Sequence, residues 1–448
     1  MGTMRTFLRA NGGRWLWTAA AVLLTALVPE YAVPVVCFVA FLRTVRRGAV
    51  PLRRTELCIA AYFLWTVIGV LYSGARVTAL GTLVPWAFFF FCGRMTANTI
   101  HSRMQLDAVL FSGALSGGLA GAVGIFQMFL FHYGDRLWKP LKVLFNPFWH
   151  FLDMGAAKLF FKILPERFAY MIPRTQFISI VTRASGTFTN PVFYAVFLCM
   201  AVPFCMYGLF YFGNRKRRLV SLVCLAFSVG GIAVSYSRGP YLALGIVFAV
   251  LLFYGKRYMW KILAAGAAFL AVFAVAAGGV FRRLLTLFST TDVSVNTRSD
   301  IWKACFQMLR GHWLFGYGSG VGNVRDRLHD VYGIRQPHAH NLFLEIVLEN
   351  GLVGLLLFLA ILAVFLRQML RLAKQGGRAR GTAITLLSSV AGFCACGMTD
   401  YLFYGLKPLC YLLLVLGLSE CAVQIYMNEI PHTEPIESEA KLCQTFYP

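Results

Sequence analysis

The chain has 448 residues, of which 58% are hydrophobic and only 13% carry a charged side chain. Soluble proteins have roughly 25% charged residues, so this composition excludes an ordinary soluble domain and indicates a multi-span membrane protein. The net charge of +24 does not indicate a nucleic-acid-binding protein, because Lys and Arg collect in the cytoplasmic loops of membrane proteins. Most of the twelve cysteines lie in apolar segments, where cysteine acts as a small hydrophobic residue, so no disulfide framework is expected.

Apolar runs recur along the chain and predict an all-α fold with about twelve membrane-spanning helices. The first run resembles a signal peptide, but further runs follow at once, so we interpret it as a retained helix. The first two runs are short for a full crossing, which is compatible with a tilted or re-entrant hairpin around Pro29 and Glu30. The predicted spans are 15–28, 31–42, 57–74, 77–93, 106–132, 191–212, 219–236, 240–254, 260–281, 341–366, 382–398 and 406–427.

Basic residues concentrate in alternate connections, and this bias predicts the orientation of the chain. With a cytoplasmic N-terminus, the short outer connections contain as basic residues only Arg76, Arg238 and Lys407. Two long connections, near 133–190 and 282–340, are then outside, which their basic residues do not contradict because long loops translocate largely regardless of charge. The Lys- and Arg-rich inner connections are 43–54, 93–103, 213–218, 255–261 and 367–380.

This topology divides the chain into six parts. The N-terminal membrane helices occupy 1–132, the core membrane helices 191–281 and the C-terminal membrane helices 341–427, and 428–448 form a cytoplasmic tail. The aromatic and basic insertion 133–190 suits an interfacial flap that shapes access of an acceptor. The large extracytoplasmic loop 282–340 is expected to contain helices.

Two arginines on different outer connections are candidates for binding an anion. Arg238 lies in the short turn SYSRGPY, where Gly239 and Pro240 explain the turn but nothing requires an arginine. Arg298 lies where a helix is expected to begin, capped by Thr297 or Ser299, and free N–H groups there favour an anion. Guanidinium binds phosphate oxygens in a bidentate fork. The alternatives are a snorkelling arginine for the first and a solvated loop arginine for the second.

The histidines of QPHAHN are the third outer group. A metal pair is one interpretation of His338 and His340, but no third ligand at a convincing spacing is evident, so no metal is expected. Capping of the helix that follows is a second interpretation. The third is a general base, since the ordinary pKa of histidine lies near neutrality. Glu345 and Glu349 follow on one face of that helix, where they are expected to line a polar cavity.

The order of these motifs resembles the O-antigen ligase and O-antigen polymerase superfamily. The resemblance covers about residues 186–366. It rests on GTFTNPVFYA, the SxSRG turn, R-x-x-x-W from Arg298 to Trp302, the glycines of GYGSG, HxHN-x-x-L-E, and the ENGLVG run that begins at Glu349. One departure is Trp313, which stands near a position where the family often has proline.

The resemblance implies a metal-independent, inverting glycosyltransferase of the GT-C-like class in the bacterial cytoplasmic (inner) membrane. Its donor would be a glycan on undecaprenyl pyrophosphate, and its acceptor a hydroxyl of a glycan or glycolipid outside the cytoplasm. No cofactor is implied.

The resemblance also assigns roles to the candidate residues. Arg238 and Arg298 would engage the pyrophosphate, and His340 would activate the acceptor hydroxyl. His338, Trp302 and Glu345 are further candidates for contact with the substrates. A transporter or flippase of lipid-linked glycans is the alternative, although such folds tend to show internal repeats and polar sites at the bilayer midplane. Ligase and polymerase both fit the motifs.

Overall fold

The computed structural model describes residues 13–44, 52–133, 183–254 and 293–427, together with positions 260 and 264. Every regular element in these residues is a helix, and eight helices are long and apolar enough to cross a membrane. The prediction of an all-α multi-span membrane protein is therefore confirmed for the described residues. These helices are α4 (Arg54–Tyr72), α5 (Arg76–Thr99), α6 (Arg103–Tyr133), α8 (Pro191–Tyr211), α9 (Arg215–Val234), α15 (Leu342–Ala373), α16 (Gly377–Gly397) and α17 (Leu406–Met427).

Three shorter apolar helices account for three more of the predicted spans. They are α2 (Trp15–Leu27), α3 (Val33–Thr44) and α10 (Arg238–Leu251), which ends in the 3₁₀ turn η3 (Leu252–Tyr254). The span expected at 260–281, most of the insertion 133–190 and the tail 428–448 lie outside the described residues. The count of twelve spans thus stays a prediction.

The first two helices form the hairpin expected around Pro29 and Glu30. The 3₁₀ turn η1 (Glu30–Ala32) joins α2 to α3. A 13-residue helix rises about 20 Å, which is less than the roughly 30 Å thickness of a bilayer core. Thr18, near the start of α2, lies 2.7 Å from Thr99 at the end of α5, whereas Ala26, near the end of α2, accepts a hydrogen bond from Thr187. The hairpin therefore reaches both ends of the helical bundle.

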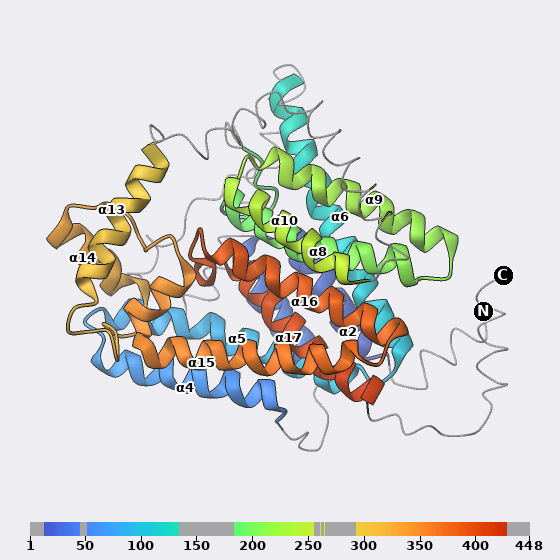
Figure 1. Cartoon of the computed structure of the whole chain (residues 1–448), viewed down its shortest axis with the longest axis horizontal. Helices are drawn as coiled ribbons and strands as arrows, with labels where there is room; N and C mark the ends of the chain where they lie inside the picture. The colour runs from blue at the N-terminus through green and yellow to red at the C-terminus, as the bar shows by residue number, and fades with distance from the viewer. Residues whose placement is uncertain are drawn as a thin grey trace.

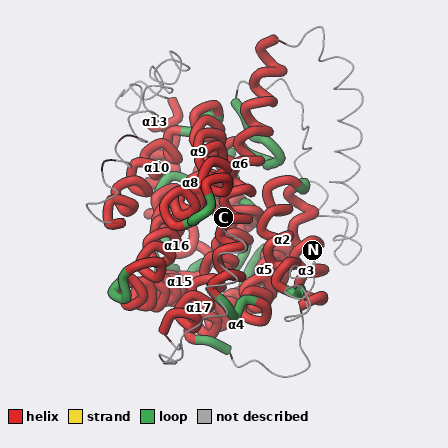
Figure 2. Tube along the Cα trace, turned by 90° about the vertical axis from the view of Figure 1, so that its right-hand side faces the viewer, coloured by secondary structure: helices red, strands yellow, loops and turns green. Residues whose placement is uncertain are grey.

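Successive helices alternate in direction, so the connections gather at two ends. Figure 1 shows α13 (Val293–Met308) and α14 (Val321–Tyr332) together at one end, which we call the α13/α14 end. The loops before α5 and α15 and after α16 also lie there, as hydrogen bonds show. The start of α10 joins them, because Gly239 packs closely on Thr399. Figure 2, turned by 90°, shows that the described residues consist of helices and the loops between them. Helices α8 and α17 are the most enclosed of the eight, because 89% and 83% of the residues in their most apolar stretches are buried.

Helices α13 and α14 share a small hydrophobic core of their own. Ile301, Cys305 and Met308 form an apolar stripe on α13 that is buried and packs with Val324 and Leu328 of α14. Ala339 and Leu348 complete this core and connect it to the start of α15. The stripe thus fixes the outer-loop helices against the segment that carries the two histidines.

The GTFTN segment is held by the α2–α3 hairpin and by the start of α17. Glu30, which is buried, accepts hydrogen bonds from the backbone of Thr189 at 2.9 Å and of Leu406 at 2.8 Å. Lys407 is fully buried and donates to the carbonyl of Thr187 at 3.0 Å, while its ammonium lies 4.0 Å from the ring centroid of Phe188. These contacts join three segments that are distant in sequence at the α13/α14 end.

Candidate functional site

The two histidines lie on the segment that leads into α15. The side chain of Asn341 caps this helix by accepting hydrogen bonds from the backbone of Phe343 and Leu344 at 3.0 and 3.1 Å. Capping is therefore done by Asn341, and the interpretation of the histidines as caps is wrong. His340 has a φ of 50°, a left-handed conformation that is uncommon for a residue other than glycine. Such strained residues cluster at functional sites.

Ala339, between the two histidines, is held on both sides of its backbone. Its N–H donates to Glu345 Oε2 at 2.6 Å, and its carbonyl accepts from the indole N–H of Trp302 at 2.9 Å. Glu345 has no exposed surface, so in this structure it does not offer the direct substrate contact that we expected. Trp302, which is half-buried, also holds the histidine segment through its indole N–H.

Asp400 is the functional candidate that sequence reasoning missed. It lies between α16 and α17, is 4% exposed, and its Oδ1 lies 3.1 Å from Nδ1 of His340. The same oxygen accepts from the backbone N–H of Tyr401 at 2.9 Å. Burial alone would raise the pKa of Asp400, but the hydrogen bond from His340 and electrostatic interactions with the two histidines hold this pKa below its ordinary value. An ionised Asp400 therefore faces His340.

The ionised carboxylate determines which nitrogen of His340 is reactive. Because a carboxylate only accepts hydrogen bonds, Nδ1 of His340 carries the proton, and Nε2 of the neutral ring keeps its lone pair. Nε2 lies 3.3 Å from Oε1 of Gln336. Because this oxygen can only accept, the Gln336 amide must rotate to direct its NH₂ group at the lone pair of Nε2. His340 thus has the orientation of a general base that takes a proton at Nε2.

His338 is a neutral partner in this group. Its Nδ1 accepts from the backbone N–H of His340 at 3.2 Å, so the proton of its neutral ring lies on Nε2, 3.9 Å from Asp400 Oδ1. Burial is the main reason that its pKa is lowered to about 4; Asp400 opposes this shift, whereas electrostatic interactions with His340 and Arg298 add to it. At neutral pH, His338 therefore carries no charge to offer an anion.

The SYSRGPY turn lies beside the Asp400 segment. Arg238 begins α10, and Gly239 packs so closely on Thr399 that a Cβ atom at Gly239 would collide with the Thr399 side chain. Thr399 directly precedes Asp400. The arginine turn and the histidine segment, about 100 residues apart in sequence, thus both contact the loop between α16 and α17.

Arg298 occupies a different position in its helix than expected. The helix α13 begins at Val293, so Arg298 is its sixth residue, and neither Thr297 nor Ser299 is its cap. The expectation that free backbone N–H groups lie at Arg298 is therefore wrong, because the helix extends upstream through a sequence in which we saw no periodic signal. The positive charge of Arg298 contributes to the lowered pKa of His338, so Arg298 is close enough to the histidines to interact with them electrostatically.

The glycines of GYGSG follow a tight path against the membrane helices. Gly318 has a φ of 95°, and a Cβ there would collide with the backbone of Ser73 at the end of α4. The N–H of Gly320 donates to Glu349 Oε2 at 3.0 Å, so this amide is occupied by a carboxylate. The buried Glu349 therefore connects the GYGSG segment to α15, and these contacts explain the segment without a phosphate.

Two clusters in the described residues have side chains of the kind that hold metal ions. One is His338, His340 and Asp400, and the other is the buried group Cys37, Cys92 and Cys410; within each cluster the possible ligand atoms lie within 4.8 Å of one another. Our sequence argument against a metal, that the histidines lack a third ligand, is thus incorrect, since Asp400 supplies one. The carboxylate oxygen in the first cluster already accepts from His340 and from the backbone of Tyr401, an arrangement typical of a hydrogen-bonded base.

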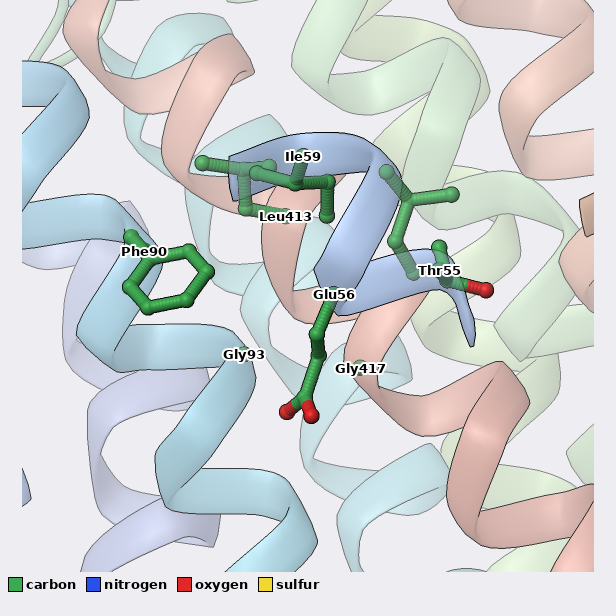
Figure 3. Close-up of a pocket in the computed structure, with 8 residues that line it drawn as sticks. Thr55, Glu56, Ile59, Phe90, Gly93, Leu413 and Gly417 are labelled. Atoms are coloured by element: carbon green, nitrogen blue, oxygen red, sulfur yellow. The ribbon is translucent and has the colours of Figure 1, made fainter. Parts of the chain in front are cut away.

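A small pocket at the opposite end of the bundle is far from this chemistry. It lies between α4, α5 and α17, and Figure 3 shows Glu56 at its edge among apolar side chains. Glu56 accepts from Arg94 at 2.7 Å and from the backbone of Arg53 at 2.8 Å. Its carboxylate is thus engaged in joining helix ends. The pocket is lined by Thr55, Glu56, Ile59, Phe90, Gly93, Leu413, Leu416 and Gly417.

Comparison with known proteins agrees with the motifs that surround the site. No curated protein is similar enough to the chain to count as a match. Residues 223–359 match the family model described as O-antigen ligase. This range contains Arg238, Arg298 and His340, whereas Asp400 lies beyond it. The match covers less than half of the chain and, together with the apolar helices, supports a multi-pass membrane protein of the O-antigen ligase and polymerase superfamily.

Proposed function

We propose that this protein transfers a glycan from undecaprenyl pyrophosphate to an acceptor hydroxyl at the extracytoplasmic side of the bacterial inner membrane. The reaction is inverting and metal-independent, on a scaffold of the GT-C-like class. The observation that carries the proposal is the hydrogen bond between His340 and Asp400, which orients a histidine as a base beside the arginine turn. The family match supports glycan ligation or polymerisation as the general reaction.

In the proposed reaction, Nε2 of His340 removes the proton from the acceptor hydroxyl. The oxygen then attacks the anomeric carbon from the face opposite the pyrophosphate, and the bond between this carbon and the pyrophosphate oxygen breaks, which inverts the configuration. Asp400 stabilises the imidazolium that forms and keeps the ring oriented. A positioned base of this kind contributes roughly 10²–10⁴-fold to the rate.

Arg238 and Arg298 are proposed to bind the pyrophosphate. Its departure develops negative charge, and fixed cations directed at that charge stabilise the transition state by typically about 3–4 kcal/mol each. His338 would add a neutral N–H donor to the site, whereas Trp302 and Glu345 would hold the histidine segment in place. The acceptor is a hydroxyl of a glycan or glycolipid. His340 would remove its proton in the same way in a ligase and in a polymerase.

The test is transfer in proteoliposomes that contain a lipid-linked oligosaccharide and an acceptor, without an ion gradient. We expect the wild-type protein to form product, and Arg238→Ala and Arg298→Ala each to lose it by at least about 100-fold while remaining inserted. Lys303→Ala is the matched control, because Lys303 lies on α13 with Arg298 but its side chain is 71% exposed. Full activity of both arginine variants, or movement of the donor lipid across the bilayer without transfer, would contradict the proposal, and the second result would indicate a flippase.

A further inference from the structure

Arg183 lies beside the SYSRGPY turn and was not among the candidates from the sequence. Its Nε donates to the carbonyl of Ser235 at 3.0 Å, and its Nη2 donates to Oγ of Ser237 at 2.7 Å. The next residue, Ala184, donates from its backbone to the carbonyl of Val234 at 3.0 Å. The segment that begins at Arg183 is thus docked along the end of α9 and the start of α10.

The two acceptors of Arg183 flank a strained residue. Tyr236, between Ser235 and Ser237, has a φ of 50°, and among the described residues only Tyr236 and His340 are non-glycine residues with positive φ. Such a conformation persists where the surroundings fix it. Ser235 Oγ also accepts from the backbone of Ser237 at 3.2 Å, but this bond lies within the turn. Arg183 holds the turn from outside.

The segment that follows Arg183 is anchored to α6. The side-chain oxygen of Gln127 accepts from the backbone of Ser185 at 3.0 Å and of Gly186 at 2.9 Å. A continuous series of hydrogen bonds therefore runs from α6 through residues 183–186 to the turn that begins α10 with Arg238. The planar guanidinium can bridge two acceptors in a fixed geometry, which the single ammonium of a lysine cannot reproduce.

We propose that Arg183 is a positioning residue: by bridging Ser235 and Ser237 it fixes the SYSRGPY turn in the conformation that presents Arg238 to the pyrophosphate of the donor. This inference rests on the proposed function. It assigns Arg183 an effect on the donor that acts through Arg238, and no role in proton removal from the acceptor.

A double-mutant cycle of Arg183→Gln, Arg238→Gln and the combined variant tests this assignment in the reconstituted transfer assay. We expect Arg183→Gln to lower kcat/KM for the lipid-linked donor by about 10–100-fold, since small misplacements of a binding group have effects of this size, and to leave the KM for the acceptor unchanged. The combined variant should be no worse than Arg238→Gln, because residues that act through one another are not additive. Arg183→Lys should not restore transfer.

Arg218→Gln is the matched control for these variants. Arg218 also donates from Nε to a backbone carbonyl, that of Phe212, but next to the other end of α9, so wild-type transfer is expected. Additive losses in the double variant, an equal rise in the KM of donor and acceptor, or wild-type kinetics of Arg183→Gln would overturn the inference.

Hydrogen exchange of the turn distinguishes failure of this inference from failure of the proposed function. Arg183→Gln should accelerate exchange of the backbone amides at 235–241, whereas Arg238→Gln should not. If Arg183→Gln loosens the turn while Arg238→Gln transfers glycan at the wild-type rate, the proposed role of Arg238 is refuted. The stabilisation of the turn by Arg183 is then still supported. Unchanged exchange in Arg183→Gln would refute the claim that Arg183 fixes the conformation of the turn.

Discussion

The peptide group of Ala339 illustrates how single residues orient the proposed base. Its two polar atoms are held by Glu345 and Trp302, which come from α15 and α13. Because His338 and His340 flank this residue, the two hydrogen bonds help determine the direction in which both imidazole side chains project. The left-handed φ of His340 is thereby held by contacts on the residue before it, and Asp400 holds the ring itself.

Replacing Asp400 by Asn tests the orientation of the base. Asparagine keeps the shape but loses the charge and can present an N–H to Nδ1, which would favour the wrong tautomer of His340. We expect the transfer rate to fall by about 10²–10⁴-fold with little change in donor KM, as measured in proteoliposomes. Asp330→Asn is the control, because Asp330 forms a similar pair with His329 at 2.9 Å on the exposed surface of α14; wild-type activity of Asp400→Asn would rule out its role.

Burial of neutral His338 predicts how stability depends on pH. Its pKa is about 4 in the folded protein, against an ordinary value of 6.5. Between these values the unfolded chain binds a proton that the folded chain does not, so the contribution to stability is full above pH 6.5, declines as the pH falls, and is lost by about pH 4. The unfolding temperature in detergent should therefore fall less over this window in His338→Asn than in wild type; equal slopes would contradict the prediction.

At the scale of elements, α15 is interrupted where the outer loop meets the membrane helices. Gly351 within α15 has φ 67° and ψ −173°, which breaks the helix. The backbone N–H groups of Leu352 and Val353, just after the break, donate to the carbonyls of Trp313 and Leu314 at 2.8 and 3.4 Å. Trp313 thus uses its backbone for this contact while its side chain is exposed. The loop replaces the hydrogen bonds that the break removes.

Gly351→Ala should destabilise this junction. The added methyl group would meet the carbonyl of Leu314, and alanine disfavours the positive φ. We expect a loss of about 1–3 kcal/mol in stability, seen as a lower unfolding temperature, together with reduced transfer. Gly245→Ala in α10 is the control, since a Cβ there meets no atom within 4 Å and alanine favours helix. Equal unfolding temperatures for the two variants would show that the break tolerates a side chain.

The helices were largely predictable from sequence, whereas their boundaries and partners were not. Long apolar runs predicted the membrane-spanning helices, because a helix needs about 20 mostly apolar residues to cross the hydrocarbon core of a bilayer. The start of α13 was missed by about five residues, since its first turns lack an apolar period. Asp400 was missed for a different reason: it lies 60 residues beyond His340, and no spacing rule links them. An acidic residue at the boundary of two spans, predicted on the same face as the histidines, was the available signal.

At the scale of the whole molecule, the proposed chemistry and the basic connections lie at opposite ends of the bundle. The site residues are at the α13/α14 end, and the described basic clusters 215–218 and 367–380 flank the other end. Lys and Arg are in excess in the cytoplasmic loops of membrane proteins, so the basic end is expected in the cytoplasm. This supports an extracytoplasmic location of the site.

Labelling of single introduced cysteines measures this orientation. Ser299→Cys on α13 and Gln375→Cys between α15 and α16 are both at exposed positions, at the two ends of the bundle. In intact cells, a membrane-impermeant maleimide should modify Ser299→Cys, and should modify Gln375→Cys only after permeabilisation. The wild-type chain is the control, because its described cysteines are buried or half-buried. The reverse pattern would place the site in the cytoplasm and refute the proposed donor side.

The interruption of α15 also has a consequence for engineering this protein. Carbonyl groups of the outer loop complete a membrane helix, and Ser319 of the same loop donates to the carbonyl of Thr66 in α4 at 2.7 Å. Loop and membrane helices therefore depend on each other to form, so a loop excised as a fragment would leave exposed amides behind. Chimeras that exchange acceptor preference between relatives should take α4, the loop and the first half of α15 as one inseparable cassette.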